Sequence, residues 1–217
     1  MKYWILTFFS FIAFQDSFGN SIPNAPTQLK SYDKVNPLGT NEAPYFSWIF
    51  SDPDDNEVQT AYQVIVSENY QNLVNDIGDV WDSGQVYSSK QNYVFIENQT
   101  LSPATKYYWK VRTWDKDGQQ SSFSEYATFT TGLLQNEDSS GAKWIKRNTN
   151  DSDDYTYYRK QFSLPNKTIK SAITYVSASH SYELYLNGEL VGKGFNHHYP
   201  SYTYYQAWDI TNFLNEN

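Results

Sequence analysis

The chain has 217 residues, a formal net charge of −8 at pH 7, no cysteine, and an aromatic content of 18%. It carries no stripe of Lys and Arg side chains that could neutralise phosphates, so the composition excludes a nucleic-acid-binding protein. The 20 tyrosines and 7 tryptophans favour pleated, half-buried surfaces, and we therefore expect an all-β protein of one large or two small domains.

The N-terminus begins with a short apolar segment at 3–14. A segment of this length is too short to cross a bilayer, but it suits the apolar part of a secretion signal. Ser17 and Gly19 then supply small residues at the spacing that signal cleavage requires. We therefore predict a signal peptide at 1–19 and a secreted, extracellular protein without a membrane span. The alternative is a buried N-terminal strand.

The region after the signal is predicted to form a first β-module. Residues 46–50 alternate with period two, which places Trp48 on the buried face of a strand. The acidic loop 51–57 ends this strand. Further segments of strand type follow at 62–67, 80–84, 93–95 and 126–130. We find no apolar pattern of helical period with a useful length, so no helix is expected.

A local motif at 101–107 indicates the fold of this module. Leu101, Pro103 and Thr105 lead a corner, after which the hydroxyl of Tyr107 can return to the upstream backbone as a tyrosine corner. The next strand is expected to point Tyr107, Trp109 and Val111 inward and Lys106, Lys110 and Arg112 toward water. This spacing resembles that of fibronectin type III domains, so we place a fibronectin type III-like (immunoglobulin-like) β-sandwich at 23–132.

A second β-module is predicted after a polar linker at 133–141. Alternating segments occur at 157–162, 169–176 and 182–186, and the pair Asn187 and Gly188 predicts a hairpin with positive φ at both residues. These segments supply about five strands, fewer than the eight of a jelly roll. We therefore expect a partial jelly-roll or galactose-binding-like β-sandwich at 142–217, truncated at the chain end and prone to aggregation.

Six motifs occur in order along the chain, at 80–84, 108–115, 129–133, 144–145, 182–188 and 208–211. Together they resemble the N-terminal, non-catalytic region of bacterial-type α-L-rhamnosidases, glycoside hydrolase family 78. The resemblance implies that an (α/α)6 barrel, which nothing in this sequence matches, carries the carboxylates of inverting hydrolysis. We therefore expect no catalytic residue here and a chain that is inactive by itself. The missing downstream catalytic domain and rhamnose-containing glycans are its expected partners.

The aromatic stretch near the end of the chain is the candidate for sugar contact. It comprises His198, Tyr199, Tyr202, Tyr204, Tyr205 and Trp208. Rings with polar edges suit the C–H face of a sugar, whereas the alternative is ordinary packing, including a surface that faces the barrel. Neighbouring residues of a strand, such as His197 and His198, point to opposite faces, so no metal site is expected there.

The acidic loop offers four carboxylates, those of Asp52, Asp54, Asp55 and Glu57. They could gather oxygens around Ca²⁺, but the loop lacks the glycine and the spacing of an EF-hand. We therefore interpret the loop as a solvated turn and predict neither a metal nor a cofactor.

The sequence leaves the roles of the three sequons and of Trp114 open. Sequons at Asn98, Asn150 and Asn166 could carry glycans in a eukaryote. By alternation, Trp114 lies on the outward face of its strand. There it either stacks on Arg112 or docks against the second module, and we favour docking.

Two functions are compatible with these features. We favour an N-terminal accessory region, scaffolding or carbohydrate-contacting, of a secreted α-L-rhamnosidase-like glycoside hydrolase. The alternative is a free-standing secreted adhesion or lectin-like binding protein built on the same sandwich.

Overall fold

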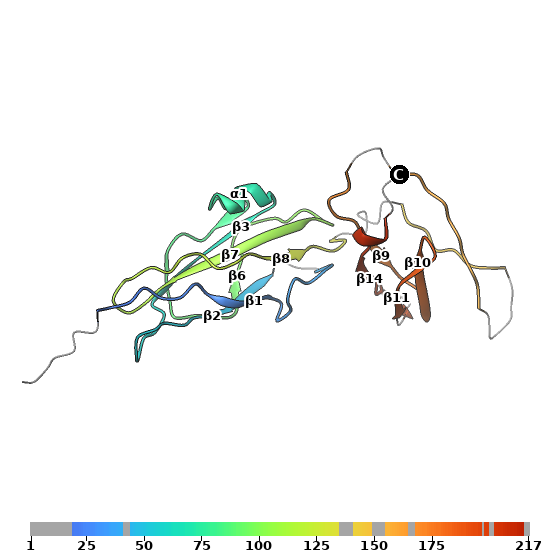
Figure 1. The fold of residues 1–217 in the computed structure, drawn as a ribbon. Coiled ribbons are helices and arrows are strands. Elements are labelled where there is room, and N and C mark those ends of the chain that lie inside the picture. The colour runs from blue at the N-terminus through green and yellow to red at the C-terminus, as the bar shows by residue number, and fades with distance from the viewer. Residues whose placement is uncertain are drawn as a thin grey trace, which may run out of the picture.

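The computed structural model describes residues 19–40, 44–134, 141–148, 155–164, 168–196, 198–199 and 202–214. Over these residues the protein is all-β, as expected, and consists of two modules (Figure 1). The first module is coloured blue to yellow-green in the figure, and the second is orange to red. The predicted signal peptide falls outside the described residues except for its last position. In the described part of the chain, no helix is long and apolar enough to cross a membrane.

Two antiparallel sheets form the first module. The smaller sheet has the strand order β1 (Thr27–Ser31), β2 (Tyr45–Ile49) and β6 (Val94–Phe95). The larger sheet has the order β4 (Trp81–Asp82), β3 (Ala61–Ser67), β7 (Lys106–Trp114) and β8 (Ala127–Thr130), and β5 (Val86–Tyr87) pairs with the other end of β3. This pair of facing sheets is an immunoglobulin-like sandwich of the fibronectin type III kind, which confirms the predicted fold class.

The hydrophobic core of the chain lies between these two sheets. Phe46 and Trp48 of β2 pack in one buried cluster with Val64 of β3 and Trp109 of β7. The ring centroids of Phe46 and Trp109 lie 4.4 Å apart. Alternation along each strand produces this core, because successive side chains of a strand point to opposite faces of the sheet.

The predicted tyrosine corner is present. The backbone N–H of Ser102 donates to the hydroxyl of Tyr107 at 2.8 Å, which ties the corner to the start of β7. Tyr107, Trp109 and Val111 are all buried, so the predicted inward face of this strand is confirmed.

The predicted outward face of β7 is wrong at Lys110. The side chain of Lys110 is only 10% exposed, forms an ion pair with Asp76, and lies 4.8 Å from the ring centroid of Phe123. A short helix that the sequence analysis missed, α1 (Tyr70–Val74), packs beside β3 and β7 through the buried Leu73. The helix and the turn after it cover part of the face that alternation had assigned to water.

The strands described in the second module form three two-stranded antiparallel ladders. They pair β10 (Ser181–Leu186) with β11 (Glu189–Phe195), β9 (Ile173–Val176) with β14 (Gln206–Asp209), and β12 (His198–Tyr199) with β13 (Tyr202–Thr203). A 3-10 helix, η2 (Thr211–Phe213), follows the last strand. The hairpin between β10 and β11 has positive φ at Asn187 (51°) and Gly188 (87°), which confirms the predicted turn.

The strand expected at 157–162 is wrong, because these residues pair with no strand in the described part of the chain. Tyr157 is 97% exposed, and Tyr158 and Phe162 are more than half exposed. Alternation alone does not make a strand, since each strand needs a neighbour to satisfy its backbone groups. Among the described residues, every member of the buried hydrophobic cluster belongs to the first module.

The two modules meet through tyrosines of the second module. The hydroxyl of Tyr175 donates to the carbonyl oxygen of Thr131 at 3.0 Å, and the N–H of Leu133 donates to the hydroxyl of Tyr205 at 2.9 Å. The two tyrosine rings are perpendicular, with centroids 5.5 Å apart. Partial burial at this contact raises the pKa of both Tyr175 and Tyr205.

Gly39→Ala is expected to loosen this junction. Gly39 has φ of +69°, and a Cβ built on it would lie 2.9 Å from the Cβ of Ala207 in β14. Gly84→Ala is the matched control, because Gly84 also has positive φ (+59°) but has open space around it. Both variants share the cost of a left-handed alanine, about 1–2 kcal/mol, so only the clash separates them. Small-angle scattering should show an expanded chain for Gly39→Ala alone; equal profiles would contradict the junction.

Candidate functional site

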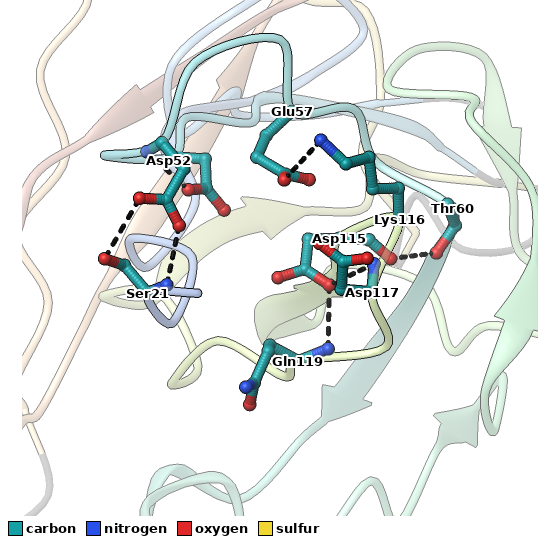
Figure 2. A network of polar contacts seen from close by, with 9 residues as sticks. Ser21, Asp52, Glu57, Thr60, Asp115, Lys116, Asp117 and Gln119 are labelled. Carbon is teal, nitrogen blue, oxygen red and sulfur yellow. Dashed lines mark hydrogen bonds and ion pairs between the residues drawn. The ribbon is translucent and has the colours of Figure 1, made fainter. Parts of the chain in front are cut away.

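An acidic cluster forms where the loop after β2 meets the turn after β7 (Figure 2). Carboxylate oxygens of Asp52, Glu57 and Asp115 all lie within 4.8 Å of one another. The register of the larger sheet brings them together. The N–H of Thr60 donates to the carbonyl oxygen of Trp114 at 2.8 Å, and its hydroxyl donates to that of Asp115. The end of the acidic loop is thereby fixed beside the end of β7.

Asp115 is fully buried, and one of its two carboxylate oxygens is held by the backbone. Oδ1 accepts from the N–H of Asp117 at 2.9 Å and from the N–H of Gln119 at 2.7 Å. This arrangement forms the turn after β7 and fixes the orientation of the carboxylate. The second oxygen, Oδ2, is therefore directed toward Asp52 and Glu57 (Figure 2).

Asp52 and Glu57 are held in the same way, each through one oxygen. Oδ1 of Asp52 accepts from the N–H of Asp54 at 2.9 Å, and Oε1 of Glu57 lies 2.7 Å from Nζ of Lys116. The hydrogen bond to Glu57 raises the pKa of Lys116. The remaining oxygens, Oδ2 of Asp52 and Oε2 of Glu57, are buried without a hydrogen-bond partner among the described residues, as is Oδ2 of Asp115.

The interpretation of the acidic loop as a solvated turn is wrong for Glu57, whose side chain is only 3% exposed. The loop divides its four carboxylates between three environments. Asp55 is exposed, Asp54 accepts from the N–H and hydroxyl of Ser21, and Asp52 and Glu57 join Asp115. Sequence reasoning missed Asp115 because it lies far away along the chain and only the pairing of β3 with β7 brings it close.

Trp208, one of the sugar-contact candidates, is engaged in packing. Its indole Nε1–H donates to the hydroxyl of Tyr182 at 2.9 Å, and that hydroxyl donates to Oε1 of Gln206 at 2.6 Å. The ring lies against Gly192, where a Cβ would come within 2.3 Å of it. Trp208 therefore joins β14 to the hairpin of β10 and β11.

The other members of the aromatic stretch have different surroundings. Tyr205 lies at the junction described above, and Tyr204 is more than half exposed. The side chains of His198, Tyr199 and Tyr202 lie outside the described residues.

Trp114 and one of the three sequons lie in the described part of the chain. The favoured docking of Trp114 against the second module is wrong, because Trp114 stacks with Arg112, whose Cζ lies 5.3 Å from its ring centroid. Tyr175 and Tyr205 make the junction instead. Of the three sequons, Asn98 is exposed in a turn with φ of 54°, and Asn150 and Asn166 fall outside the described residues.

A second aromatic group, not anticipated from the sequence, lies on the outer face of the smaller sheet. The ring of Tyr45 lies 5.1 Å from that of Tyr32, 4.9 Å from that of Tyr93 and 5.7 Å from that of Phe95, measured between centroids. The hydroxyl of Tyr45 donates to Asp33 at 2.8 Å, which raises the pKa of Tyr45. Alternation places Tyr45 of β2 and Phe95 of β6 on the outward face of the sheet, and this pattern could have predicted the group.

A shallow depression adjoins this aromatic group. Its lining includes Lys30, Asp33, Trp48, Gln91 and Tyr93. The combination of an exposed ring with polar side chains is typical of surfaces that contact sugars or peptides.

Comparison with known proteins gives one family and several relatives. Residues 26–135 match the family described as the Rha78A-like, N-terminal immunoglobulin domain. An α-L-rhamnosidase of Formosa agariphila is 35% identical over 213 residues, which cover 84% of this chain and 22% of that protein. A Streptomyces avermitilis α-L-rhamnosidase is 40% identical over 110 residues, which cover 50% of this chain and 10% of that protein.

Solved structures of α-L-rhamnosidases match both modules of this chain. The α-L-rhamnosidase from Dictyoglumus thermophilum matches with a TM-score of 0.76 and 36% identity, covering 91% of this chain and 24% of that one. The α-L-rhamnosidase from Aspergillus terreus matches with a TM-score of 0.69 and 25% identity, covering 88% of this chain and 22% of that one. This chain thus spans less than a quarter of the length of these solved proteins.

Proposed function

The chain belongs to the family with the Rha78A-like N-terminal immunoglobulin domain, and on this premise we propose that it is the N-terminal accessory region of a secreted α-L-rhamnosidase-like glycoside hydrolase. In this role the chain supplies no catalytic group. The first sandwich is a stable base, and the second module, attached through Tyr175 and Tyr205, contacts the rest of such an enzyme.

The observation that carries this proposal is the difference in burial between the modules. The first module has a dry core of aromatic and branched side chains. The second leaves large apolar residues exposed: Trp144, Ile145, Phe162, Leu190 and Phe195. A set of short ladders cannot be stable in water by itself, because it needs a further layer to cover its apolar side chains.

A chimera tests the scaffolding role. This chain would replace the corresponding N-terminal part of the Dictyoglumus thermophilum α-L-rhamnosidase, with which it shares 36% identity. We expect the chimera to stay soluble and to hydrolyse an aryl rhamnoside, whereas the enzyme without that part should aggregate or unfold at a lower temperature. A chimera no better than the shortened enzyme would contradict the proposal.

Two surface variants of the chimera locate the contact. Ile145→Lys places a charge on an exposed apolar position of the second module, and Tyr87→Lys does so on the first. Only Ile145→Lys is expected to lower the unfolding temperature of the chimera. The isolated chain should release no aryl alcohol from the same substrate, and activity there would overturn its non-catalytic role.

Carbohydrate contact is a second candidate function, favoured by the aromatic group at Tyr45 and the depression beside it. Tyr93 lines that depression and its side chain is exposed, so the intrinsic tyrosine and tryptophan fluorescence of the full chain should respond to millimolar rhamnose or rhamnosides. Tyr93→Ala should abolish a response that arises there, whereas Tyr204→Ala should abolish one from the aromatic stretch of the second module. No fluorescence change in the unmodified chain would exclude both surfaces.

A further inference from the structure

We propose that the first sandwich binds one Ca²⁺ ion between Asp52, Glu57 and Asp115. The site lies at the end of the sandwich where the described chain begins, since the same loop holds Ser21 through Asp54. In Figure 1 this end lies opposite the second module. The site is therefore separate from the junction and from the apolar surface discussed above.

The spacing of the oxygens fits a single ion. Two oxygens bound to one Ca²⁺ at the usual 2.3–2.6 Å can be no more than about 5 Å apart. The three carboxylates each offer an oxygen, and these oxygens lie within 4.8 Å of one another. Mutual repulsion opposes such closeness, and a cation bound between the three carboxylates would offset it.

Burial and orientation supply an independent argument. Asp115 is fully buried, and its Oδ2 has no hydrogen-bond donor among the described residues, although its Oδ1 has two. The backbone therefore aims a bare anionic oxygen into the cluster. Buried carboxylates are stable only when they are paired or coordinate a metal. Asp52 and Glu57 repeat this pattern of one bonded and one bare oxygen.

The charges balance with a divalent cation. Three carboxylates and the ammonium of Lys116 leave a net charge of −2, which one divalent ion neutralises. Lys116 contacts the outer oxygen of Glu57 and is itself 44% exposed, so it borders the cluster rather than filling it.

Oxygen-only ligands from two loops favour Ca²⁺ over other divalent ions. Carboxylate oxygens suit hard cations, which excludes the softer metals that prefer sulfur and imidazole. Mg²⁺ requires near-ideal octahedral geometry and retains its waters, whereas Ca²⁺ accepts irregular sets of oxygens completed by carbonyls and water. Such an ion would join the loop after β2 to the turn after β7.

Calorimetric titration of the full chain with CaCl₂, after chelator treatment, tests the proposal. We expect heat that saturates at one ion per chain. At a free Ca²⁺ concentration about 100 times Kd, we expect the sandwich to unfold about 10 °C higher. The absence of both effects would overturn the site, and an equal response to Mg²⁺ would overturn the choice of ion. A water or a proton shared by the carboxylates would give neither effect.

Variants assign the response to these residues. Asp115→Asn keeps an acceptor for the N–H groups of Asp117 and Gln119 but loses the bare anionic oxygen, so binding should disappear. Asp52→Asn should do the same if Asp115→Asn fails to fold. Asp55→Asn makes the same change in charge at an exposed position of the same loop and should bind normally. Without the ion, Asp115→Asn should unfold at or above the temperature of the unmodified chain, because repulsion is reduced. Calcium binding retained in both buried variants would overturn the assignment.

Discussion

Trp109→Ala is expected to lower the free energy of unfolding of the sandwich by about 3–5 kcal/mol, the usual cost of deleting a large buried side chain. Trp109 is fully buried at the centre of β7, and its ring packs against that of Phe46. Its removal leaves a cavity between the two sheets that neighbouring side chains, held by their strands, cannot fill. Denaturant unfolding followed by tryptophan fluorescence and circular dichroism gives the change.

Two variants control this experiment. Trp144→Ala removes an exposed tryptophan and should change stability by no more than about 0.5 kcal/mol. Trp109→Phe should cost much less than Trp109→Ala, because the indole N–H has no hydrogen-bond partner among the described residues and its loss leaves no acceptor unpaired. If Trp109→Ala and Trp144→Ala had similar effects, the core would have been assigned wrongly.

Gly192→Ala is expected to disrupt the second module while leaving the first intact. A Cβ on Gly192 would lie 2.3 Å from the ring of Trp208, and the hydrogen bond to Tyr182 prevents the ring from turning away. We expect a loss of about 1–3 kcal/mol, the usual cost of forcing an extra methyl group against packed neighbours. Nuclear magnetic resonance should show shifted or broadened signals for β10, β11 and β14 and unchanged signals for β3 and β7.

A double-mutant cycle distinguishes this clash from other effects of the alanine. Trp208→Ala removes the ring that Gly192→Ala would strike, so the double variant should be more stable than the sum of the two single effects predicts. Strict additivity would contradict the contact. Gly188→Ala in the nearby turn has open space and positive φ, so it should show the backbone cost alone.

The local features of the first module could be predicted because short-range rules determine them. Alternation gave the buried positions of β2 and β7, and the motif before Tyr107 gave the corner that the hydrogen bond to Ser102 confirms. The resemblance to α-L-rhamnosidases is confirmed by the matching family and by relatives that share both modules. These signals depend on residues that are neighbours along the chain or in one strand.

The failures have a common physical cause, which is contact between distant segments. Lys110 was assigned to water because alternation cannot show that α1 and Asp76 cover one face of β7. Asp115 was missed in the acidic cluster because its proximity to Glu57 depends on the register of β3 against β7. Tyr157 was assigned to a strand, yet a strand requires a partner that its own sequence does not specify.

Backbone hydrogen bonds pair the segment before β2 with β8, and this pairing has a consequence for the order of folding. The N–H of Thr130 donates to the carbonyl oxygen of Pro37, and the N–H groups of Thr40 and Gly132 complete the seam at 2.9 and 2.7 Å. These hydrogen bonds join residues that are about 90 positions apart, so the sandwich cannot close until nearly all of its chain is present. Thr131, to which Tyr175 binds, belongs to that last-formed edge. The edge to which Tyr175 binds is complete only when the first module has closed, so we expect the second module to dock after that closure.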